Sequence, residues 1–311
     1  MGVFVALVTV ARADPSAVQT PVTVDAGAGV QLSGTLTTPP GAGRSPVALI
    51  IAGSGPTDRD GNGPLAKTGT YKLLAAALAA AGIATLRYDK RGVGTSRTTQ
   101  QESDLRFDDL VADAVTLTHY LESTKRFSSV SIVGHSEGSL IGMLAAQRDP
   151  AVKAFVSLEG AGRRAPVVLE EQVQAAGASP AIAAEVAQYD RSLLAGQTVP
   201  SPDPQLLALF RPSVQPYLIS WYKYDPATEI AKLRIPVLIV QGTTDLQVTI
   251  SDANRLAAAN PRAKLAVIAG MNHVLRAAPA DRSQNLATYT DPSLPLDPRV
   301  TAAIAEFLLA P

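Results

Sequence analysis

Ser129-Val130-Ser131-Ile132-Val133-Gly134-His135-Ser136-Glu137-Gly138 carries the pattern G-x-S-x-G directly after a β-branched run. The run predicts a buried strand, and residues 137–148 predict a helix that ends before Pro150, because apolar side chains recur on one face up to that point. A serine in a tight strand-to-helix turn exposes its hydroxyl to a base and to backbone N–H groups that bind a developing oxyanion. Ser136 is therefore a candidate nucleophile.

Length and composition favour a globular protein with a large core. The chain has 311 residues, of which 46% are hydrophobic and 17% charged, which suits one domain with an insertion. Lys and Arg number 27, as do Asp and Glu, so the balanced charge predicts no nucleic-acid partner and no binding to an acidic membrane surface. The absence of cysteine excludes disulfides, a thiol nucleophile and thiolate metal sites.

The N-terminal segment resembles the end of a secretory signal. Residues 3–10 are apolar and precede Ala11-Arg12-Ala13, so residues 1–13 are interpreted as a truncated signal peptide. This interpretation predicts a periplasmic or secreted protein. The alternative is a loose hydrophobic terminus on a cytoplasmic protein. No apolar run approaches the ~18 residues that a membrane-spanning helix needs, so we expect no membrane span.

Predicted strands alternate with predicted helices, which indicates an α/β protein with a mostly parallel central sheet flanked by helices. Two alternating segments, 22–25 and 30–38, predict an antiparallel pair near the sheet edge. Near-continuous apolar runs predict central strands covered on both faces, at 47–52, 83–88, 130–133, 152–157, 236–240 and 264–268. Amphipathic periodicity predicts further helices at 71–81, 107–121, 251–259 and 300–309.

One segment is too long for a single crossover. Residues 159–230 are helical in parts and broken by prolines, and we interpret them as an inserted helical cap on a core formed by 22–158 and 231–311. The end of this segment contains Tyr217, Trp221 and Tyr222, including the only tryptophan of the chain. These aromatics either pack the cap onto the core or line an apolar substrate pocket.

The base that activates Ser136 is chosen among three histidines. His119 lies off the apolar stripe of its helix, and the side chain of His135 should point away from its neighbour Ser136 into the structure. His273 lies in a loop just past the last predicted core strand, where it can reach back across the carboxyl edge of the sheet. We therefore expect His273 to be the base.

A carboxylate must hold the second nitrogen of that imidazole. Asp245 follows the predicted strand 236–240 and so lies at the same edge of the sheet. Asp225 and Asp252 are more simply explained as helix caps or surface charges. The resulting chain order of the catalytic residues is Ser136, Asp245, His273.

The oxyanion hole needs two backbone donors. Glu137 follows the nucleophile, and Ser54 lies in the glycine-rich turn after the strand 47–52. A carboxylate at Glu137 opposes a developing oxyanion unless a cation neutralises it. Lys90 and Arg91 both lie at the end of a neighbouring predicted strand, and we hypothesise that Arg91 pairs with Glu137.

Two further patterns do not predict cofactor sites. Residues 58–63 begin like a calcium loop, but Gly69 stands at its twelfth position, where a bidentate glutamate is needed. Residues 92–94 lack the third glycine of a dinucleotide fingerprint and are better explained as a tight turn. The sequence contains no zinc-ligand set, so we expect no metal and no cofactor.

These motifs together resemble those of the α/β-hydrolase superfamily, and within it the bacterial esterases related to serine aminopeptidase-like hydrolases. The resemblance covers residues 22–311 and rests on these segments: Gly53-Ser54-Gly55-Pro56 with 58–61, residues 87–96, Gly134-His135-Ser136-Glu137-Gly138, and Asp245 with Asn272-His273. The order of the candidate catalytic residues is also the one that this superfamily uses. The resemblance implies an α/β-hydrolase fold with a cap and a carboxylic ester hydrolase.

The leading hypothesis is a serine carboxylesterase that hydrolyses small-molecule esters of short to medium acyl groups through an acyl-enzyme on Ser136. The same catalytic residues also suit a peptidase or aminopeptidase-like amidase, or an acyltransferase. A binding protein without activity is a third hypothesis, although such proteins commonly lose one catalytic residue. The oligomeric state stays open.

Overall fold

The structure is a computed structural model that describes residues 17–41, 43–64 and 66–310. Its centre is an eight-stranded sheet with the order β1-β2-β4-β3-β5-β6-β7-β8. The strands are β1 Val18–Gly27, β2 Val30–Thr38, β3 Val47–Ile51, β4 Ala84–Tyr88, β5 Val130–His135, β6 Val152–Leu158, β7 Val237–Gly242 and β8 Lys264–Ile268. Strands β1 and β2 pair antiparallel, β2 also pairs antiparallel with β4, and the strands from β4 to β8 are parallel. The predicted α/β class is confirmed.

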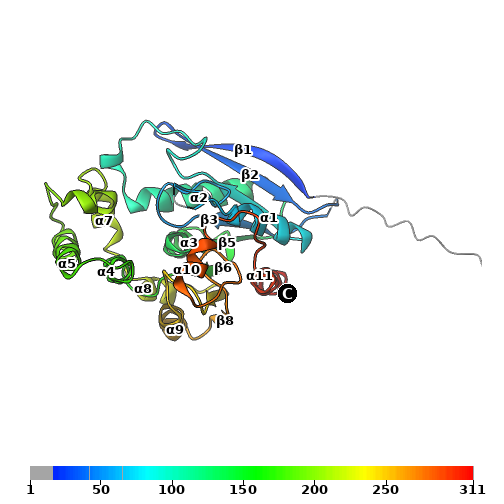
Figure 1. The fold of residues 1–311 in the computed structure, drawn as a ribbon. Helices are drawn as coiled ribbons and strands as arrows, with labels where there is room; N and C mark the ends of the chain where they lie inside the picture. The colour runs from blue at the N-terminus through cyan, green and yellow to red at the C-terminus, as the bar shows by residue number, and fades with distance from the viewer. Residues whose placement is uncertain (1–16, 42, 65, 311) are drawn as a thin grey trace, which may run out of the picture.

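Helices cover both faces of this sheet (Figure 1). On one face α1 (Thr70–Ala80) and α11 (Pro298–Leu309) pack on one apolar core, and on the other α2 (Phe107–Ser123), α3 (Glu137–Arg148) and α9 (Ile250–Ala259) pack on a second. Successive side chains of a strand point to opposite faces. In β3, for example, Ile50 belongs to the first core and Leu49 to the second. This double covering explains the continuous apolar runs.

One predicted central strand is an edge strand instead. The run at 264–268 suggested burial on both faces, but β8 closes the sheet beside β7, and its Leu265 and Val267 are 38% and 45% exposed. The expectation that this strand is buried on both faces was wrong. The apolar sequence of a strand does not show whether the strand has one neighbour in the sheet or two.

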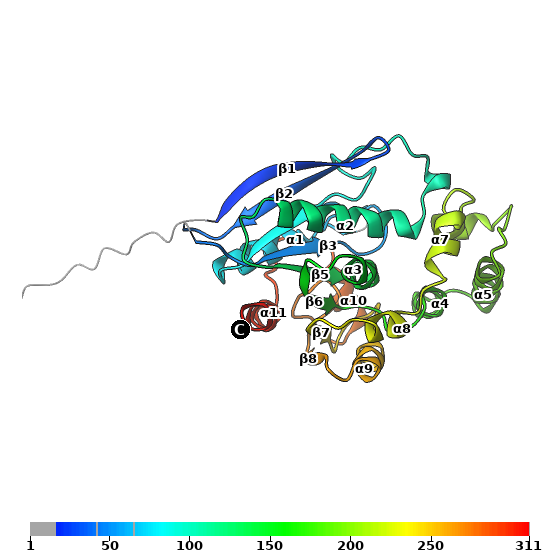
Figure 2. The ribbon, with the colours of Figure 1, turned by 180° about the vertical axis from the view of Figure 1, so that it is seen from behind.

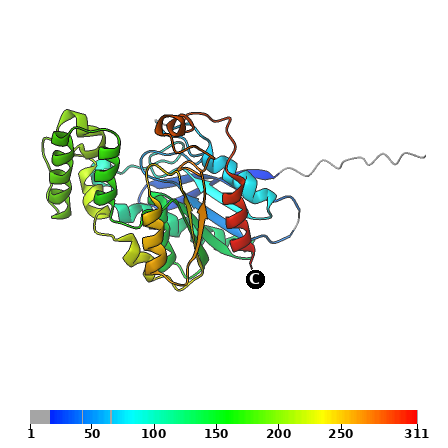
Figure 3. The same ribbon diagram turned by 60° about the horizontal axis from the view of Figure 1, so that its bottom comes forward.

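The segment between β6 and β7 contains a group of helices, which are α4 Ala165–Ala175, α5 Pro180–Leu194, η2 Pro204–Leu206, α6 Leu207–Phe210, α7 Gln215–Trp221 and α8 Pro226–Ala231. Figures 1 and 2 show α4, α5 and α7 of this group projecting beyond one end of the sheet. Figure 3 shows that this group stands apart from α11 and the C-terminus. Outside it, the short elements η1 Glu102–Asp104 and α10 Arg282–Ala287 complete the fold. We call residues 159–230 the insertion.

In the part of the chain that the structure describes, no helix combines the length and the apolar character that crossing a membrane requires. The expected signal segment, residues 1–13, lies outside the described residues.

The parallel strands bring their carboxyl ends to one edge of the sheet. The segments that follow β3, β5, β6, β7 and β8 begin there, and they contain Ser54, Ser136, Glu159, Asp245 and His273 respectively. Ligands of open α/β sheets bind outside the carboxyl ends of the strands. This edge is where the candidate site is built.

Candidate active site

Ser136 occupies a strained turn between β5 and α3. Its backbone has φ 54° and ψ −122°, a conformation that L-residues rarely adopt. The flanking glycines are required by close packing, since a Cβ at Gly134 would lie 2.2 Å from the carbonyl oxygen of Gly138, and one at Gly138 would lie 2.3 Å from that of Ile51. The N–H of Ser136 donates to the carbonyl of Leu158 at 2.9 Å, which ties the turn to β6. The predicted elbow is present.

His273 and Asp245 form a hydrogen-bonded pair at the same sheet edge. His273 Nδ1 lies 2.7 Å from Asp245 Oδ2, and both side chains are buried. The other oxygen of Asp245 accepts the backbone N–H groups of Gln247 and Val248, at 2.7 and 3.0 Å. These contacts orient the imidazole as a general base requires. His273 and Ser136 line one cavity of about 620 Å³.

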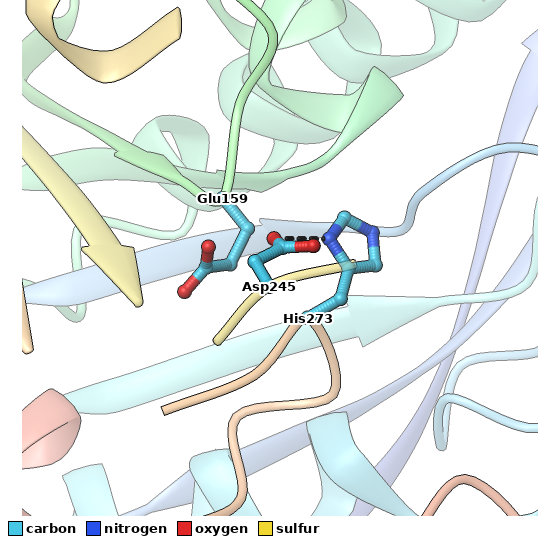
Figure 4. A group of neighbouring side chains, drawn as sticks. All are labelled: Glu159, Asp245 and His273. Carbon is cyan, nitrogen blue, oxygen red and sulfur yellow. Dashed lines mark hydrogen bonds and ion pairs between the residues drawn. The ribbon is translucent and has the colours of Figure 1, made fainter. Parts of the chain in front are cut away.

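A second carboxyl group, which the sequence analysis did not single out, lies behind Asp245. Glu159 follows β6 and is fully buried, and Figure 4 shows Asp245 between it and His273. Within the described residues these three side chains form one group whose ligand-type atoms lie within 4.8 Å of one another. Glu159 accepts the N–H of Gly242 at 2.9 Å and the amide N–H of Gln241. It thereby holds the turn that carries Asp245.

The pKa values of the two neighbouring carboxyl groups, Glu159 and Asp245, are shifted in opposite directions. Burial, with the neighbouring charge of Asp245, raises the pKa of Glu159 well above its ordinary value. Burial also opposes ionisation of Asp245, but the adjacent His273 and the hydrogen bonds from His273 and Glu159 hold the pKa of Asp245 below its usual value. Of the two, Asp245 is therefore the carboxyl group that ionises more readily, and a proton is favoured on Glu159.

His135 connects the elbow to two other loops. Burial, with the neighbouring His273, lowers the pKa of His135 to about 3, so its imidazole is neutral. Nε2 lies 2.8 Å from the carbonyl oxygen of His273, which can only accept, so Nε2 carries the hydrogen and Nδ1 accepts from the Tyr71 hydroxyl at 2.8 Å. That hydroxyl in turn accepts the N–H of Gly53 at 3.0 Å. The prediction that His135 points into the structure is confirmed.

The expected cation beside Glu137 is Lys90. Its Nζ donates to Glu137 Oε2 at 3.0 Å, to the carbonyl of Gly55 at 3.2 Å and to that of Gly53. Tyr217 of the insertion donates its hydroxyl to Glu137 Oε1 at 2.6 Å. The hypothesis that Arg91 pairs with Glu137 is wrong, because the Arg91 guanidinium binds Asp113 of α2, at 2.6 and 2.8 Å.

The two proposed oxyanion donors come from the segments that follow β3 and β5. Glu137 begins α3, where the first backbone N–H groups of a helix have no acceptor within the helix. Ser54 follows β3 and lines the same cavities as Ser136. Lys90 holds the carbonyls on both sides of Ser54, so it braces this loop against the elbow.

The three aromatic residues of the insertion occupy different places. Trp221 lines a cavity of about 50 Å³ together with Ser136. Tyr217 lines another, of about 400 Å³, together with Glu137 and Lys90. Tyr222 is buried inside the insertion and donates its hydroxyl to Asp190 at 2.7 Å, and it is not among the described residues that line these two cavities. The structure therefore does not bring Tyr222 to Ser136.

The loop at 58–63 is a turn held by its own side chains. Asp58 Oδ1 accepts the N–H groups of Asp60 and Asn62, both at 2.9 Å, and Asp60 binds Arg87 at 2.9 Å. These bonds account for the aspartates without a bound cation.

Comparisons with known proteins agree with this architecture. Residues 62–193 match the family described as serine aminopeptidase, S33. The chain is 28% identical over 254 residues to esterase EstD from Thermotoga maritima, a match that covers 78% of this chain and 58% of that protein. The chain thus spans less than two thirds of the length of this curated relative.

Solved structures of similar fold include Est1E and an esterase. Est1E from Butyrivibrio proteoclasticus aligns with a TM-score of 0.60 at 21% identity, over 93% of this chain and 97% of that one. The esterase Pf2001 from Pyrococcus furiosus aligns with a TM-score of 0.59 at 15% identity, over 94% and 90%. These likenesses show that the fold is that of the α/β-hydrolases.

Proposed function

We propose that this protein belongs to the α/β-hydrolase superfamily and is a serine carboxylesterase that forms an acyl-enzyme on Ser136. The observation that carries the proposal is a serine in a strained turn which shares a cavity with a histidine bound to a buried carboxylate. The similarity to esterase EstD supports the same reaction class.

In the proposed mechanism His273 Nε2 takes the proton from the Ser136 hydroxyl as the oxygen attacks the ester carbonyl. Asp245 holds Nδ1–H and stabilises the imidazolium that forms. The N–H groups of Ser54 and Glu137 bind the oxyanion. The tetrahedral intermediate then expels the alcohol, whose oxygen receives the proton from His273. A water molecule, activated by His273 in the same way, hydrolyses the acyl-enzyme and releases the acid.

The scarcity of available carboxylates in the described lining around Ser136 favours an esterase over an aminopeptidase. An N-terminal amine needs acidic partners, but the described residues lining the cavity that holds His273 include neither Asp nor Glu. In the smaller cavity beside Ser136 the acidic lining residue is Glu137, whose carboxylate already binds Lys90 and Tyr217. Comparing aminoacyl anilides with acyl esters separates the two activities, and a clear preference for the anilides contradicts the proposal.

The proposed nucleophile is tested by Ser136→Ala. We expect kcat for p-nitrophenyl acetate to fall by about 10³-fold or more, because serine, histidine and aspartate act as a unit. A fluorophosphonate should label the wild-type protein one to one, and the variant not at all. The matched control, Ser128→Ala on an exposed turn, should behave as wild type. Unchanged turnover in Ser136→Ala refutes the mechanism, and a folded wild type that takes no label indicates a binding protein.

We also propose that the protein is exported, because the apolar residues 3–10 precede Ala11-Arg12-Ala13. N-terminal sequencing of the native protein tests this, and an intact N-terminus on protein found in the cytoplasm contradicts it.

A further inference from the structure

Two cavities of very different size meet at Ser136. The small one, about 50 Å³, has a mixed lining. Its apolar side chains are Leu140, Val168, Leu169, Trp221 and Val248, and its polar ones include Arg163 and Gln172. The large one, about 620 Å³, is lined by residues that include His273, Leu286 and Tyr289. Both are lined by Ser54, Ser136, Gln172 and Gln247. The candidate nucleophile therefore stands at the boundary between a narrow pocket and a wide one.

The proton transfer from His273 to the leaving alcohol shows which cavity holds the alcohol and which holds the acyl group. This step rests on the proposed esterase function. When the tetrahedral intermediate collapses, the leaving alcohol oxygen must receive a proton from His273. His273 lines the large cavity and is not among the lining residues of the small one. The alcohol must therefore lie in the large cavity, which leaves the small cavity for the acyl chain.

The small cavity limits the length of that chain. One water molecule needs about 10–15 Å³ of such space, so a cavity of this volume admits only a few non-hydrogen atoms beyond the carbonyl carbon. We propose that the substrates are esters of short acyl groups, with about two to four carbons, and of alcohols larger than the acyl group.

A buried ion pair closes the end of the small cavity. Glu137 is the one described residue that lines both this cavity and the neighbouring cavity of about 400 Å³. Its carboxylate is held by Lys90 and by the hydroxyl of Tyr217, and its side chain is 2% exposed. An acyl chain that continued into the neighbouring cavity would have to displace these groups and leave a buried charge unpaired, which is costly.

The large cavity has room for a large alcohol, and part of its mainly apolar lining is polar. Its volume lies within the range of about 300–1,000 Å³ that small-molecule sites occupy. Thr57, Gln247, Arg282 and Tyr289 line it with hydroxyl, amide and guanidinium groups. These groups offer hydrogen bonds to hydroxyl-bearing alcohols, such as polyols or sugars, that a simple alkyl alcohol cannot use.

The acyl limit is tested with p-nitrophenyl acetate, butyrate, hexanoate and octanoate. We expect kcat/KM to fall by at least about ten-fold from butyrate to octanoate, because extra methylenes must force apart a packed wall. Leu169→Ala widens that wall and should raise kcat/KM for hexanoate relative to acetate by about three-fold or more. The matched control Leu194→Ala changes an exposed leucine of α5 that lines neither cavity, and it should keep the wild-type order.

A second variant tests whether the large cavity binds the alcohol, as Leu169→Ala tests whether the small one binds the acyl group. Leu286 lines the large cavity, so Leu286→Ala should change selectivity among acetate esters of ethanol, glycerol and a hexose, while the acyl order stays the same. Wild type should prefer the acetates of glycerol and the hexose to ethyl acetate. A preference for octanoate, or for ethyl acetate, overturns the inference, as does an acyl order that responds to Leu286→Ala and not to Leu169→Ala.

These outcomes are distinct from a failure of the proposed function. An enzyme that labels with fluorophosphonate and prefers long acyl chains overturns only the assignment of the two cavities. A folded protein that hydrolyses none of these esters and takes no label overturns both.

Discussion

At the scale of single residues, the site is built around one shared charge. Asp245 receives hydrogen bonds from His273 and from two backbone N–H groups, whereas Glu159 receives one from Gly242 and one from Gln241. The hydrogen bonds to Asp245 and the adjacent His273 favour its charge, whereas burial raises the pKa of Glu159 and favours its proton. Glu159 is therefore a positioning residue that acts on His273 through Asp245.

Glu159→Gln tests this role. Glutamine is neutral and can keep the bond from Gly242, so we expect kcat/KM within about three-fold of wild type and an unchanged acid limb of the pH–rate profile. Glu159→Ala leaves Gly242 N–H without its acceptor, and we expect a loss of about 1–3 kcal/mol in unfolding free energy and lower activity.

The pH–rate profile of Glu159→Gln distinguishes a protonated Glu159 from an ionised one. If Glu159 were ionised, Glu159→Gln would remove a negative charge near His273 and destabilise the imidazolium. The acid limb would then move to lower pH, by about one unit. Such a shift contradicts the assignment of the proton to Glu159.

At the scale of elements, the insertion has a buried polar contact of its own. Asp190 of α5 accepts the hydroxyl of Tyr222, which follows α7, and its Oδ2 has no partner within the described residues. Burial raises the pKa of Asp190 to about 7, although the bond from Tyr222 lowers it and the charge of Glu170 adds to the rise. Burial therefore makes ionisation of this carboxyl costly to the folded protein, although the bond from Tyr222 offsets part of that cost.

The sign of the pH dependence follows from linkage. Between the ordinary value of 3.8 and about pH 7, the folded protein holds a proton on Asp190 that the unfolded chain has released, so stability falls as pH rises through this window. Asp190→Asn removes that cost. We expect the variant to gain about 2 kcal/mol in unfolding free energy at pH 8 and little at pH 4.

Urea denaturation at pH 4 and pH 8 measures these changes. The control Asp104→Asn replaces an exposed aspartate of η1 and should change stability little at either pH. Equal gains for Asp190→Asn at both pH values contradict the prediction.

At the scale of the whole molecule, one cluster joins three distant parts of the chain. Lys90 follows β4, Glu137 begins α3, and Tyr217 belongs to α7 of the insertion. The same lysine holds the carbonyls beside Ser54. The cluster therefore links the sheet edge, the elbow and the insertion.

Lys90→Met tests how much this cluster contributes to stability and to turnover. It leaves the carboxylate of Glu137 buried without its cation, which we expect to cost about 3–5 kcal/mol in unfolding free energy and to lower kcat because the Ser54 loop loses its brace. The control Lys72→Met changes an exposed lysine of α1 and should lie within about 0.5 kcal/mol of wild type.

The double variant Lys90→Met, Glu137→Leu separates charge from packing. Because it removes both charges together, it should recover much of the stability lost in the single variant. A single variant as stable as wild type, or a double variant less stable than the single one, contradicts the role given to this ion pair.

Local patterns in the sequence were sufficient for most of the fold and for the candidate catalytic residues. Strand and helix periodicity reports which faces of an element are apolar, and G-x-S-x-G reports a tight turn in which Gly134 meets the nearby Gly138. That Gly138 is also required by the approach of Ile51 in β3 is a tertiary contact. With three histidines in the chain, elimination pointed to His273, which the structure places against Asp245.

Other features depended on which segments become neighbours. Arg91 and Lys90 are adjacent in sequence, but the packing of β4 against α2 and α3 turns one toward Asp113 and the other toward Glu137. Glu159 meets Asp245 because β6 and β7 pair in parallel, and β8 is exposed because no strand follows it in the described sheet. Side chains far apart in sequence interact only when the order of the strands brings their ends together, so charge pairing and cavity size were decided by the tertiary structure.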